Sequence, residues 1–210
     1  MGGAPFVKIC GITCPEDVPA GADAIGVNFY EGSKRFVRLE DAGEWLERLG
    51  GKPARIAVVV NPEPGFVRRL AESGLFEAIQ FHGEETPDFC AACGFPVWIK
   101  AVAARDAETL EAALAYDTPH LLVDAWCPGE RGGTGRVPDW GLVAGFVRAH
   151  PERRVLLAGG LNPANVAEAV RVVRPFGVDV ASGVEGSDPR RKDPAATAEF
   201  VRRAREAAWQ

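Results

Sequence analysis

Short apolar runs alternate with longer amphipathic stretches along nearly the whole chain. The apolar runs are four to six residues long and predict β-strands. Eight of them occur, at residues 6–10, 24–29, 55–60, 78–82, 97–101, 120–124, 155–158 and 177–181. The stretches between them carry apolar residues at helical spacing, and several open with Asp, Asn or Pro, which helix starts favour. They predict helices at 42–49, 64–72, 87–92, 107–114, 140–149, 163–173 and 194–207.

This order of elements predicts the fold class. Strands that are apolar on both faces are typical of parallel sheets covered by helices. Eight strand-helix units in 210 residues predict one α/β domain over residues 1–210, a (β/α)8 TIM barrel. The alternative is an open doubly wound sheet. Its dinucleotide-binding form requires G-x-G-x-x-G after the first strand, where this chain has Gly11-Ile12-Thr13.

Alternation along the strands predicts which side chains face the barrel interior. If Val7 and Ile9 face the helices, Lys8 and Cys10 face inward. The same alternation places further side chains inside: Gln80, His82, Trp98, Lys100, Leu122, Asp124, and Asp179 or its neighbours. Unpaired buried charges cost several kcal/mol. The interior is therefore expected to hold paired charges or a wet mouth, and so a functional site.

Composition narrows the class of partner. With 47% hydrophobic and 25% charged residues, the chain is typical of globular proteins. Its 24 basic and 29 acidic residues give a net charge of −5, which argues against a nucleic-acid-binding protein and confines any anion site to a local patch. The first residues have no basic region followed by an apolar one, so we expect no targeting segment, and no apolar run is long enough to span a bilayer. We expect a cytoplasmic protein without membrane contact, as a monomer or a homodimer.

The cysteines are odd in number, which does not suggest a disulfide framework in a chain of this size. There are five, namely Cys10, Cys14, Cys90, Cys93 and Cys127. Two pairs of close cysteines raise a zinc site as a hypothesis, but no nearby histidine completes either pair. The simpler interpretation of the segment 89–95, FCAACGF, is a helix that buries small residues. We expect no metal.

Glycine-containing turns follow the last two predicted strands. Gly159 and Gly160 follow the seventh strand, and Ser182 and Gly183 follow the eighth. Barrel enzymes bind phosphate at these positions, because glycine lets main-chain N–H groups approach the oxygens and a short helix N-terminus adds a favourable dipole. The alternative is a pair of ordinary strand-to-helix turns.

Cys10 and Asp124 stand at strand ends, where barrel enzymes carry their catalysts. Asp124 is a candidate general acid, with a capping or loop-bracing carboxylate as the alternative. Cys10 is a candidate base if a cation stabilises its thiolate, with a small buried hydrophobe as the alternative. A free thiol, with a pKa of about 8.5, is mostly protonated at neutral pH. We therefore expect Lys8 or bound substrate to lower the pKa of Cys10.

Other polar residues near the predicted mouth are weaker candidates. Arg35 is the clearest cation there and suits a carboxylate or phosphate, while His82 ends its strand without an evident partner. The glycine-rich segment 126–135 is typical of a lid over a site. Three short basic clusters, at 68–69, 190–192 and 202–203, are predicted to be solvated surface.

Several motifs, taken in order, closely resemble the phosphoribosylanthranilate isomerase family of tryptophan biosynthesis. They are VKICGIT at 7–13, GADAIGV at 21–27, SKR at 33–35, IQFHG at 79–83, LVD at 122–124, GGTG at 132–135, LAGGLNPANV at 157–166 and VDVASGVE at 178–185. The resemblance covers nearly the whole chain, and KICGIT and the last segment are its most specific parts.

The resemblance implies an Amadori rearrangement of N-(5-phosphoribosyl)anthranilate to 1-(2-carboxyphenylamino)-1-deoxyribulose 5-phosphate, without a metal or organic cofactor. By position, Asp124 would be the general acid and Cys10 the general base. Arg35 would hold the anthranilate carboxylate, and the turns at Gly159, Gly160, Ser182 and Gly183 would hold the phosphate; His82 would also contact substrate.

Two departures from the family pattern stand out. Many members have Ser-Ser-Gly where this chain has Ala181-Ser182-Gly183, so one hydroxyl contact to phosphate is expected to be missing, with main-chain N–H donors to compensate. Trp126 and Cys127 stand where polar residues are more usual, which predicts changed loop packing and unchanged chemistry.

Two alternatives keep the barrel and change the function. Another phosphosugar enzyme, such as the related histidine-pathway isomerase or indole-glycerol-phosphate synthase, would share the phosphate turns. The former is expected to have paired aspartates and two similar half-barrels, and the chain has no internal half-repeat. A non-catalytic barrel that binds a phosphate ligand would need neither Cys10 nor Asp124.

Overall fold

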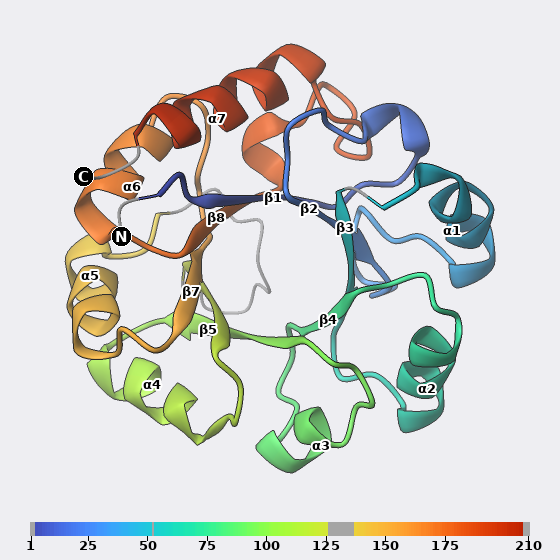
Figure 1. The fold of residues 1–210 in the computed structure, drawn as a ribbon, viewed down its shortest axis with the longest axis horizontal. Helices are drawn as coiled ribbons and strands as arrows, with labels where there is room; N and C mark the ends of the chain where they lie inside the picture. Colours follow the sequence, from blue (N-terminus) through green and yellow to red (C-terminus); the bar gives the residue numbers. More distant parts are fainter. Residues whose placement is uncertain (1–2, 52, 126–136, 208–210) are drawn as a thin grey trace.

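Eight parallel strands form a closed barrel in the order of the chain, with the helices outside it (Figure 1). The computed structural model describes residues 3–51, 53–125 and 137–207. The strands are β1 (Phe6–Cys10), β2 (Ala24–Asn28), β3 (Ala54–Val59), β4 (Ala78–Phe81), β5 (Trp98–Ala104), β6 (His120–Ala125), β7 (Arg154–Leu157) and β8 (Gly177–Val180). Because β1 pairs with β8 as well as with β2, the sheet has no free edge. The (β/α)8 prediction is confirmed.

Seven α-helices lie in the described part of the chain. They are α1 (Leu39–Leu46), α2 (Pro64–Glu72), α3 (Pro87–Ala91), α4 (Ala107–Ala112), α5 (Trp140–Ala149), α6 (Val166–Val173) and α7 (Pro194–Glu206). Short 3-10 turns supplement them: η1 (Pro15–Asp17), η2 (Glu47–Leu49), η3 (Ala113–Ala115) and η4 (Ser182–Val184). Only η1 connects β1 to β2, where the sequence likewise predicts no helix.

The helix predicted at 163–173 begins three residues later, at Val166. Asparagine side chains hold the preceding residues in a turn. Asn162 Oδ1 accepts the N–H of Ala164 at 2.8 Å, and Asn165 Oδ1 accepts the N–H of Asn162 at 2.8 Å. Asparagine competes with a helix in this way because its side chain bonds to nearby main-chain groups.

The barrel encloses a small apolar cluster, and most of the hydrophobic core lies between the strands and the helices. The interior cluster consists of Ala24, Ile56, Ala78, Ile99, Ala101, Leu122, Leu156 and Ala158. The predicted inward positions of Lys8, Gln80, Leu122 and Asp179 agree with this arrangement. Leu122 belongs to the interior cluster, Gln80 lies two residues after Ala78 of that cluster on β4, and Lys8 is in register with both Ala24 of that cluster and Asp179.

The prediction that Trp98 and Lys100 face the interior is wrong. The register pairs Gln80 with Ile99, so the odd-numbered residues of β5 face inward. Trp98 packs edge-on against Phe81 in the outer core, with 6.4 Å between ring centroids. Because both faces of a barrel strand are buried, hydrophobicity alone does not distinguish them.

Lys100 lies on the outer face of β5 and forms an ion pair there. Its Nζ donates to Glu85 Oε2 at 2.7 Å and to the Gly83 carbonyl at 2.7 Å. The carboxylate of Glu85 also accepts the N–H groups of Gly83 and Asn61. This buried pair joins the segments that follow β3 and β4, and it fixes the main chain directly after His82.

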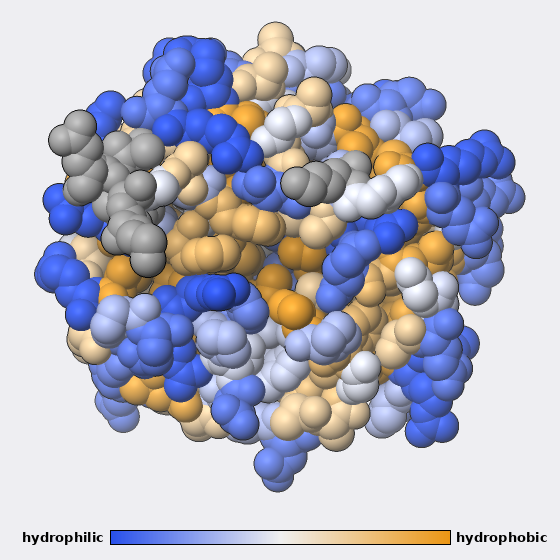
Figure 2. Space-filling model, viewed as in Figure 1, coloured by the Kyte–Doolittle hydropathy of each residue, from blue (hydrophilic) through white to orange (hydrophobic). Residues whose placement is uncertain are grey.

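The surface seen in the direction of Figure 1 is hydrophilic around its rim and more apolar toward the centre (Figure 2). Arg202 and Arg203 of one basic cluster pair with Glu199 on the outside of α7, as expected for solvated surface. In the described ranges, no helix is long and apolar enough to cross a membrane.

Candidate active site

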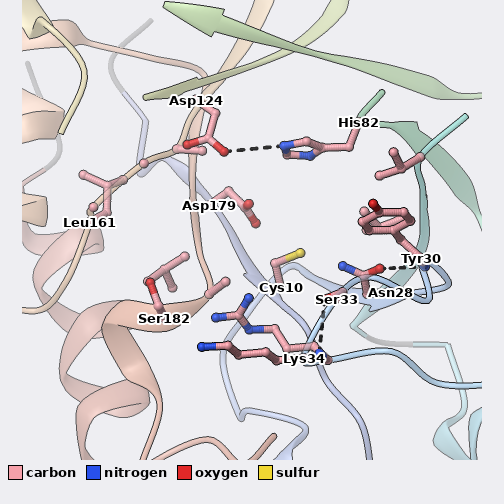
Figure 3. Close-up of a pocket in the computed structure, with 18 of the residues that line it drawn as sticks. Cys10, Asn28, Tyr30, Ser33, Lys34, His82, Asp124, Leu161, Asp179 and Ser182 are labelled. Atoms are coloured by element: carbon pink, nitrogen blue, oxygen red, sulfur yellow. Dashed lines mark hydrogen bonds and ion pairs between the residues drawn. The ribbon is translucent and has the colours of Figure 1, made fainter. Parts of the chain in front are cut away.

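A cavity of about 540 Å³ opens where the strands end and the loops begin. This volume suits a small organic ligand. Seven of the eight predicted site residues line it, namely Cys10, Arg35, His82, Asp124, Gly159, Gly160 and Ser182. The eighth, Gly183, does not line the cavity but lies in η4, directly behind Ser182. The structure therefore brings together side chains from strands that are far apart in the sequence (Figure 3).

Cys10 lies on one side of the cavity above a buried ion pair. Lys8 is fully buried, and its Nζ donates to Asp179 Oδ1 at 2.8 Å. Gly26 of β2 leaves room for the side chains of Cys10 and Lys8, because a Cβ atom at this position would lie 2.8 Å from Cys10 Sγ and 3.2 Å from Lys8 Nζ. The sulfur and the ammonium group therefore share one space beside β2.

The predicted lowering of the Cys10 pKa by Lys8 is outweighed. Burial raises the pKa of Cys10, and the Asp179 carboxylate raises it further, while Lys8 and Lys192 act in the opposite direction. The net pKa lies above that of an ordinary thiol, because a buried thiolate loses its hydration. For Lys8 the balance is different. Burial lowers its pKa, but Asp179 and Cys10 together raise it above the usual value.

Arg35 reaches the cavity from the segment after β2 and is held from two sides. Its stem crosses the main chain of Gly11, where φ is +77° and a Cβ atom would lie 2.3 Å from the Arg35 Cδ. Its guanidinium forms a bidentate pair with Glu185, Nε to Oε1 and Nη2 to Oε2, the latter at 3.0 Å. Bidentate pairs fix the plane of a guanidinium as well as its position.

Lys192 corrects the prediction for the basic cluster at 190–192. It was expected on the solvated surface, yet it is only 5% exposed. Its Nζ lies 3.2 Å from Glu185 Oε1 and donates to the Ala181 carbonyl at 3.0 Å. The sequence pattern of neighbouring basic residues does not reveal this, because the antiparallel bridge between Glu185 and Lys192 turns only one side chain of the cluster inward.

Asp124 lies with His82 on the other side of the cavity, and the two side chains point toward one another (Figure 3). The distance from His82 Nε2 to Asp124 Oδ2 is 3.5 Å. Gln80 Nε2 is 2.9 Å from His82 Nδ1. His82 thus has two partners, which the sequence alone did not indicate.

The predicted phosphate turns contact each other and the acid side of the cavity. At Gly159, where φ is +84°, a Cβ atom would lie 2.5 Å from the Ala125 nitrogen and 2.8 Å from Asp124 Oδ1. At Gly183 a Cβ atom would lie 1.9 Å from the Leu161 carbonyl oxygen. Glycine is therefore required at both positions for close main-chain packing. Such packing leaves the turn after β7 and the turn after β8 side by side.

The described cysteines, Cys10, Cys14, Cys90 and Cys93, form no disulfide with one another. Cys90 belongs to the outer core, and burial raises its pKa to about 12. Within the described ranges, no three His, Cys, Asp or Glu side chains are grouped closely enough to hold a metal ion. Cys127 and the predicted lid at 126–135 lie outside the described residues.

Further residues line the cavity that the sequence did not single out. Asn28 ends β2 and accepts the N–H of Tyr30 through Oδ1 at 2.9 Å, and both side chains face the cavity. Their position after a strand end was the available signal, since barrel sites are built from such positions. Asn28 and Tyr30 close the side of the cavity near Ser33 (Figure 3).

Comparison with known proteins agrees with this geometry. Residues 7–203 match the family model of N-(5'-phosphoribosyl)anthranilate (PRA) isomerase. The N-(5'-phosphoribosyl)anthranilate isomerase of Pelobacter propionicus is 43% identical over 204 residues, which cover 95% of each chain.

Solved structures give the same result. A crystal structure of phosphoribosyl anthranilate isomerase from Thermotoga maritima superposes with a TM-score of 0.86 at 39% identity, covering 96% of this chain and 99% of that one. A phosphoribosyl anthranilate isomerase in complex with reduced 1-(o-carboxyphenylamino)-1-deoxyribulose 5-phosphate gives 0.83 at 38%, with the same coverage. The chain therefore belongs to the N-(5'-phosphoribosyl)anthranilate isomerase family.

Proposed function

We propose that this protein catalyses the Amadori rearrangement of N-(5-phosphoribosyl)anthranilate to 1-(2-carboxyphenylamino)-1-deoxyribulose 5-phosphate in tryptophan biosynthesis. The observation that carries the proposal is a cavity that places a thiol, Cys10, and a carboxyl group, Asp124, at the ends of β1 and β6. An aldose-to-ketose rearrangement needs one acid and one base on a bound sugar, and this cavity offers both.

Asp124 is the proposed general acid. Its proton passes to the ring oxygen of the furanose, the bond from that oxygen to C1 breaks, and the anthranilate nitrogen forms an iminium with C1. His82 lies 3.5 Å from Asp124 Oδ2 and orients this carboxyl group, while Gln80 holds the imidazole from its other side. The main chain of Gly159 packs against Asp124 and excludes a side chain there.

Cys10 is the proposed general base. Its thiolate takes the proton from C2, the electron pair forms the C1–C2 double bond, and the iminium becomes a neutral enolamine. A proton then adds to C1, the C2 hydroxyl loses its proton, and the ketone forms. The free protein favours the thiol, because burial raises the pKa of Cys10. We therefore expect kcat/KM to increase with pH as the thiolate fraction increases.

Substrate binding is assigned to two groups of residues that line the cavity. The guanidinium of Arg35 is oriented by Glu185 and is proposed to bind the anthranilate carboxylate through its remaining N–H groups. The turns at Gly159, Gly160, Ser182 and Gly183 are proposed to bind the phosphate with main-chain N–H groups, as barrels do after their seventh and eighth strands. His82 also lines the cavity and is proposed to contact the substrate.

The experiment is a fluorescence assay of phosphoribosylanthranilate turnover with the intact protein, Cys10→Ala and Asp124→Asn. Loss of a general acid or base costs about 10² to 10⁴ in rate, so each variant is expected to lose at least that much in kcat. Thermal unfolding of the variants separates lost chemistry from lost folding. Full activity in either folded variant contradicts the acid-base assignment, and no turnover by the intact protein contradicts the proposed function.

A further inference from the structure

Among the described residues, the charged side chains around Cys10 carry one more positive than negative charge. Lys8 on β1 pairs with Asp179 on β8, and Arg35 pairs with Glu185. Both pairs are internally neutral, and both lie beside the thiol, since Lys8, Asp179 and Arg35 all interact with it electrostatically. Lys192 shares Glu185 with Arg35, so it adds a third cation to two carboxylates. An uncompensated buried charge is costly and favours an anion beside it.

Lys192 is held in this place by the loop that carries it. Its main-chain N–H donates to Asp17 Oδ2 at 3.0 Å, and Arg191 pairs with the same carboxylate. The N–H of Asp193 donates to the Val184 carbonyl at 2.9 Å. These contacts anchor the loop after η4 to the loop after β1, so the buried ammonium group of Lys192 has a fixed position.

The ammonium group joins two parts of the site. It contacts Glu185, which orients Arg35, and it donates to the carbonyl of Ala181, the residue before Ser182 in the predicted phosphate turn. It also acts on the thiol, because Lys192 opposes the increase in the pKa of Cys10 that burial causes. Burial lowers the pKa of Lys192 itself, while Glu185 and Cys10 oppose that change.

We propose that Lys192 is a positioning residue of this reaction: its buried ammonium group fixes Glu185, and thereby Arg35, and supplies the positive charge that favours the Cys10 thiolate. The inference rests on the proposed function for its consequence in catalysis. Its electrostatic part concerns the free protein and is testable without substrate.

The test measures the rate at which iodoacetamide alkylates Cys10 as a function of pH, with the peptide identified by mass spectrometry. In the described part of the chain, the charged groups around Cys10 are Lys8, Asp179, Arg35 and Lys192, with Glu185 paired to the last two. In Lys192→Met, which removes one of the cations, the midpoint of the profile is expected to move up by about one pH unit, within the usual range for a nearby charge. Lys192→Arg keeps the charge and is expected to keep the midpoint close to that of the wild type.

Two further variants separate this role from a structural one. Glu185→Gln leaves the charge of Lys192 unpaired, so the midpoint is expected to move down while KM increases through the loosened Arg35. Arg202→Ala is the control for an exposed basic residue: it breaks the pair with Glu199 on the outside of α7 and is expected to leave both the midpoint and kcat/KM unchanged. Thermal unfolding is followed for all variants.

In the turnover assay, Lys192→Met is expected to lower kcat and raise KM, with a loss of kcat/KM of about tenfold or more, the change that one pH unit at the base implies. A midpoint that stays at the wild-type pH in both Lys192→Met and Glu185→Gln overturns the proposal, whatever the activity. Absence of turnover by the wild type would instead overturn the proposed function and leave the alkylation result to decide the role of Lys192.

Discussion

The two sides of the cavity hold their proposed reacting groups, Cys10 and Asp124, through different kinds of interaction. Around Cys10 the groups are ionic, with the Lys8–Asp179 pair, of which Lys8 is fully buried, beneath the thiol. Beside Asp124 lies His82, and the uncharged amide of Gln80 holds the His82 ring from its other side. A thiolate needs nearby positive charge, whereas a carboxyl group that must give up a proton needs a fixed direction. We therefore distinguish an ionic side of the site, around Cys10, from a geometric side, around Asp124.

The largest effect is expected from the ionic side, at Lys8. Lys8→Met leaves the Asp179 carboxylate buried without its partner, and breaking such a pair costs about 3–5 kcal/mol in the free energy of unfolding. Urea denaturation at neutral pH measures this loss. The double variant Lys8→Met/Asp179→Leu is expected to regain much of the stability but not the activity. A single variant as stable as the wild type would show that the pair is not structural.

The same pair predicts a pH dependence of stability. Asp179 and Cys10 raise the pKa of Lys8 above its unfolded value, against the effect of burial. A group whose pKa is raised in the folded state contributes its full stabilisation of the fold at pH values below its unfolded pKa. This contribution is lost as the pH rises through the folded pKa. The stability difference between the wild type and Lys8→Met should therefore be constant near neutrality and shrink above pH ~10.4, the unperturbed value for lysine. A difference that grows with pH in that range would contradict the assignment.

A smaller effect is expected on the geometric side. Gln80→Leu removes the hydrogen bond that fixes the His82 ring, and one such bond is worth about 1 kcal/mol, so kcat should fall roughly three- to tenfold. The alkylation profile of Cys10 should stay unchanged, because Gln80 carries no charge. Steady-state kinetics and the profile are measured on the same sample. A shifted profile would mean that the two sides are not independent.

The smallest effect is expected at Ala181. Ala181→Ser restores the hydroxyl that many family members have in the turn after β8, and one added hydrogen bond to phosphate should lower KM about two- to fivefold with kcat nearly unchanged. Inorganic phosphate as a competitive inhibitor gives an independent measure, since it should bind the variant more tightly. Equal inhibition of the two proteins would show that a hydroxyl at position 181 does not contact the phosphate.

Much of the fold followed from the sequence because strand and helix periodicities are local. The eight strands and the ends of α2 and α5 agree with the predicted ranges closely. The face assignment of β5 failed, since Trp98 and Lys100 occupy buried positions outside the barrel, where hydrophobicity cannot separate one face from the other.

The sequence predicted those site residues that stand at the ends of strands. Cys10 and Asp124 are at such ends, and the cavity includes both. The contacts that tune them depend on long-range packing: Lys192 meets Glu185 across a turn of the loop after η4, and His82 meets Asp124 across the barrel mouth. Neither contact has a local pattern, so the sequence pointed to the reacting groups and not to their support.

The central claim is that Asp124 opens the ring and Cys10 removes the C2 proton. The most direct test is the kinetic isotope effect with substrate deuterated at C2, measured for the wild type, Asp124→Asn and Cys10→Ser. Weakening the acid should make ring opening limiting, so the isotope effect falls toward one in Asp124→Asn. Weakening the base should make proton removal limiting, so the effect increases in Cys10→Ser. Isotope effects that change in the same direction in both variants would contradict this division of roles.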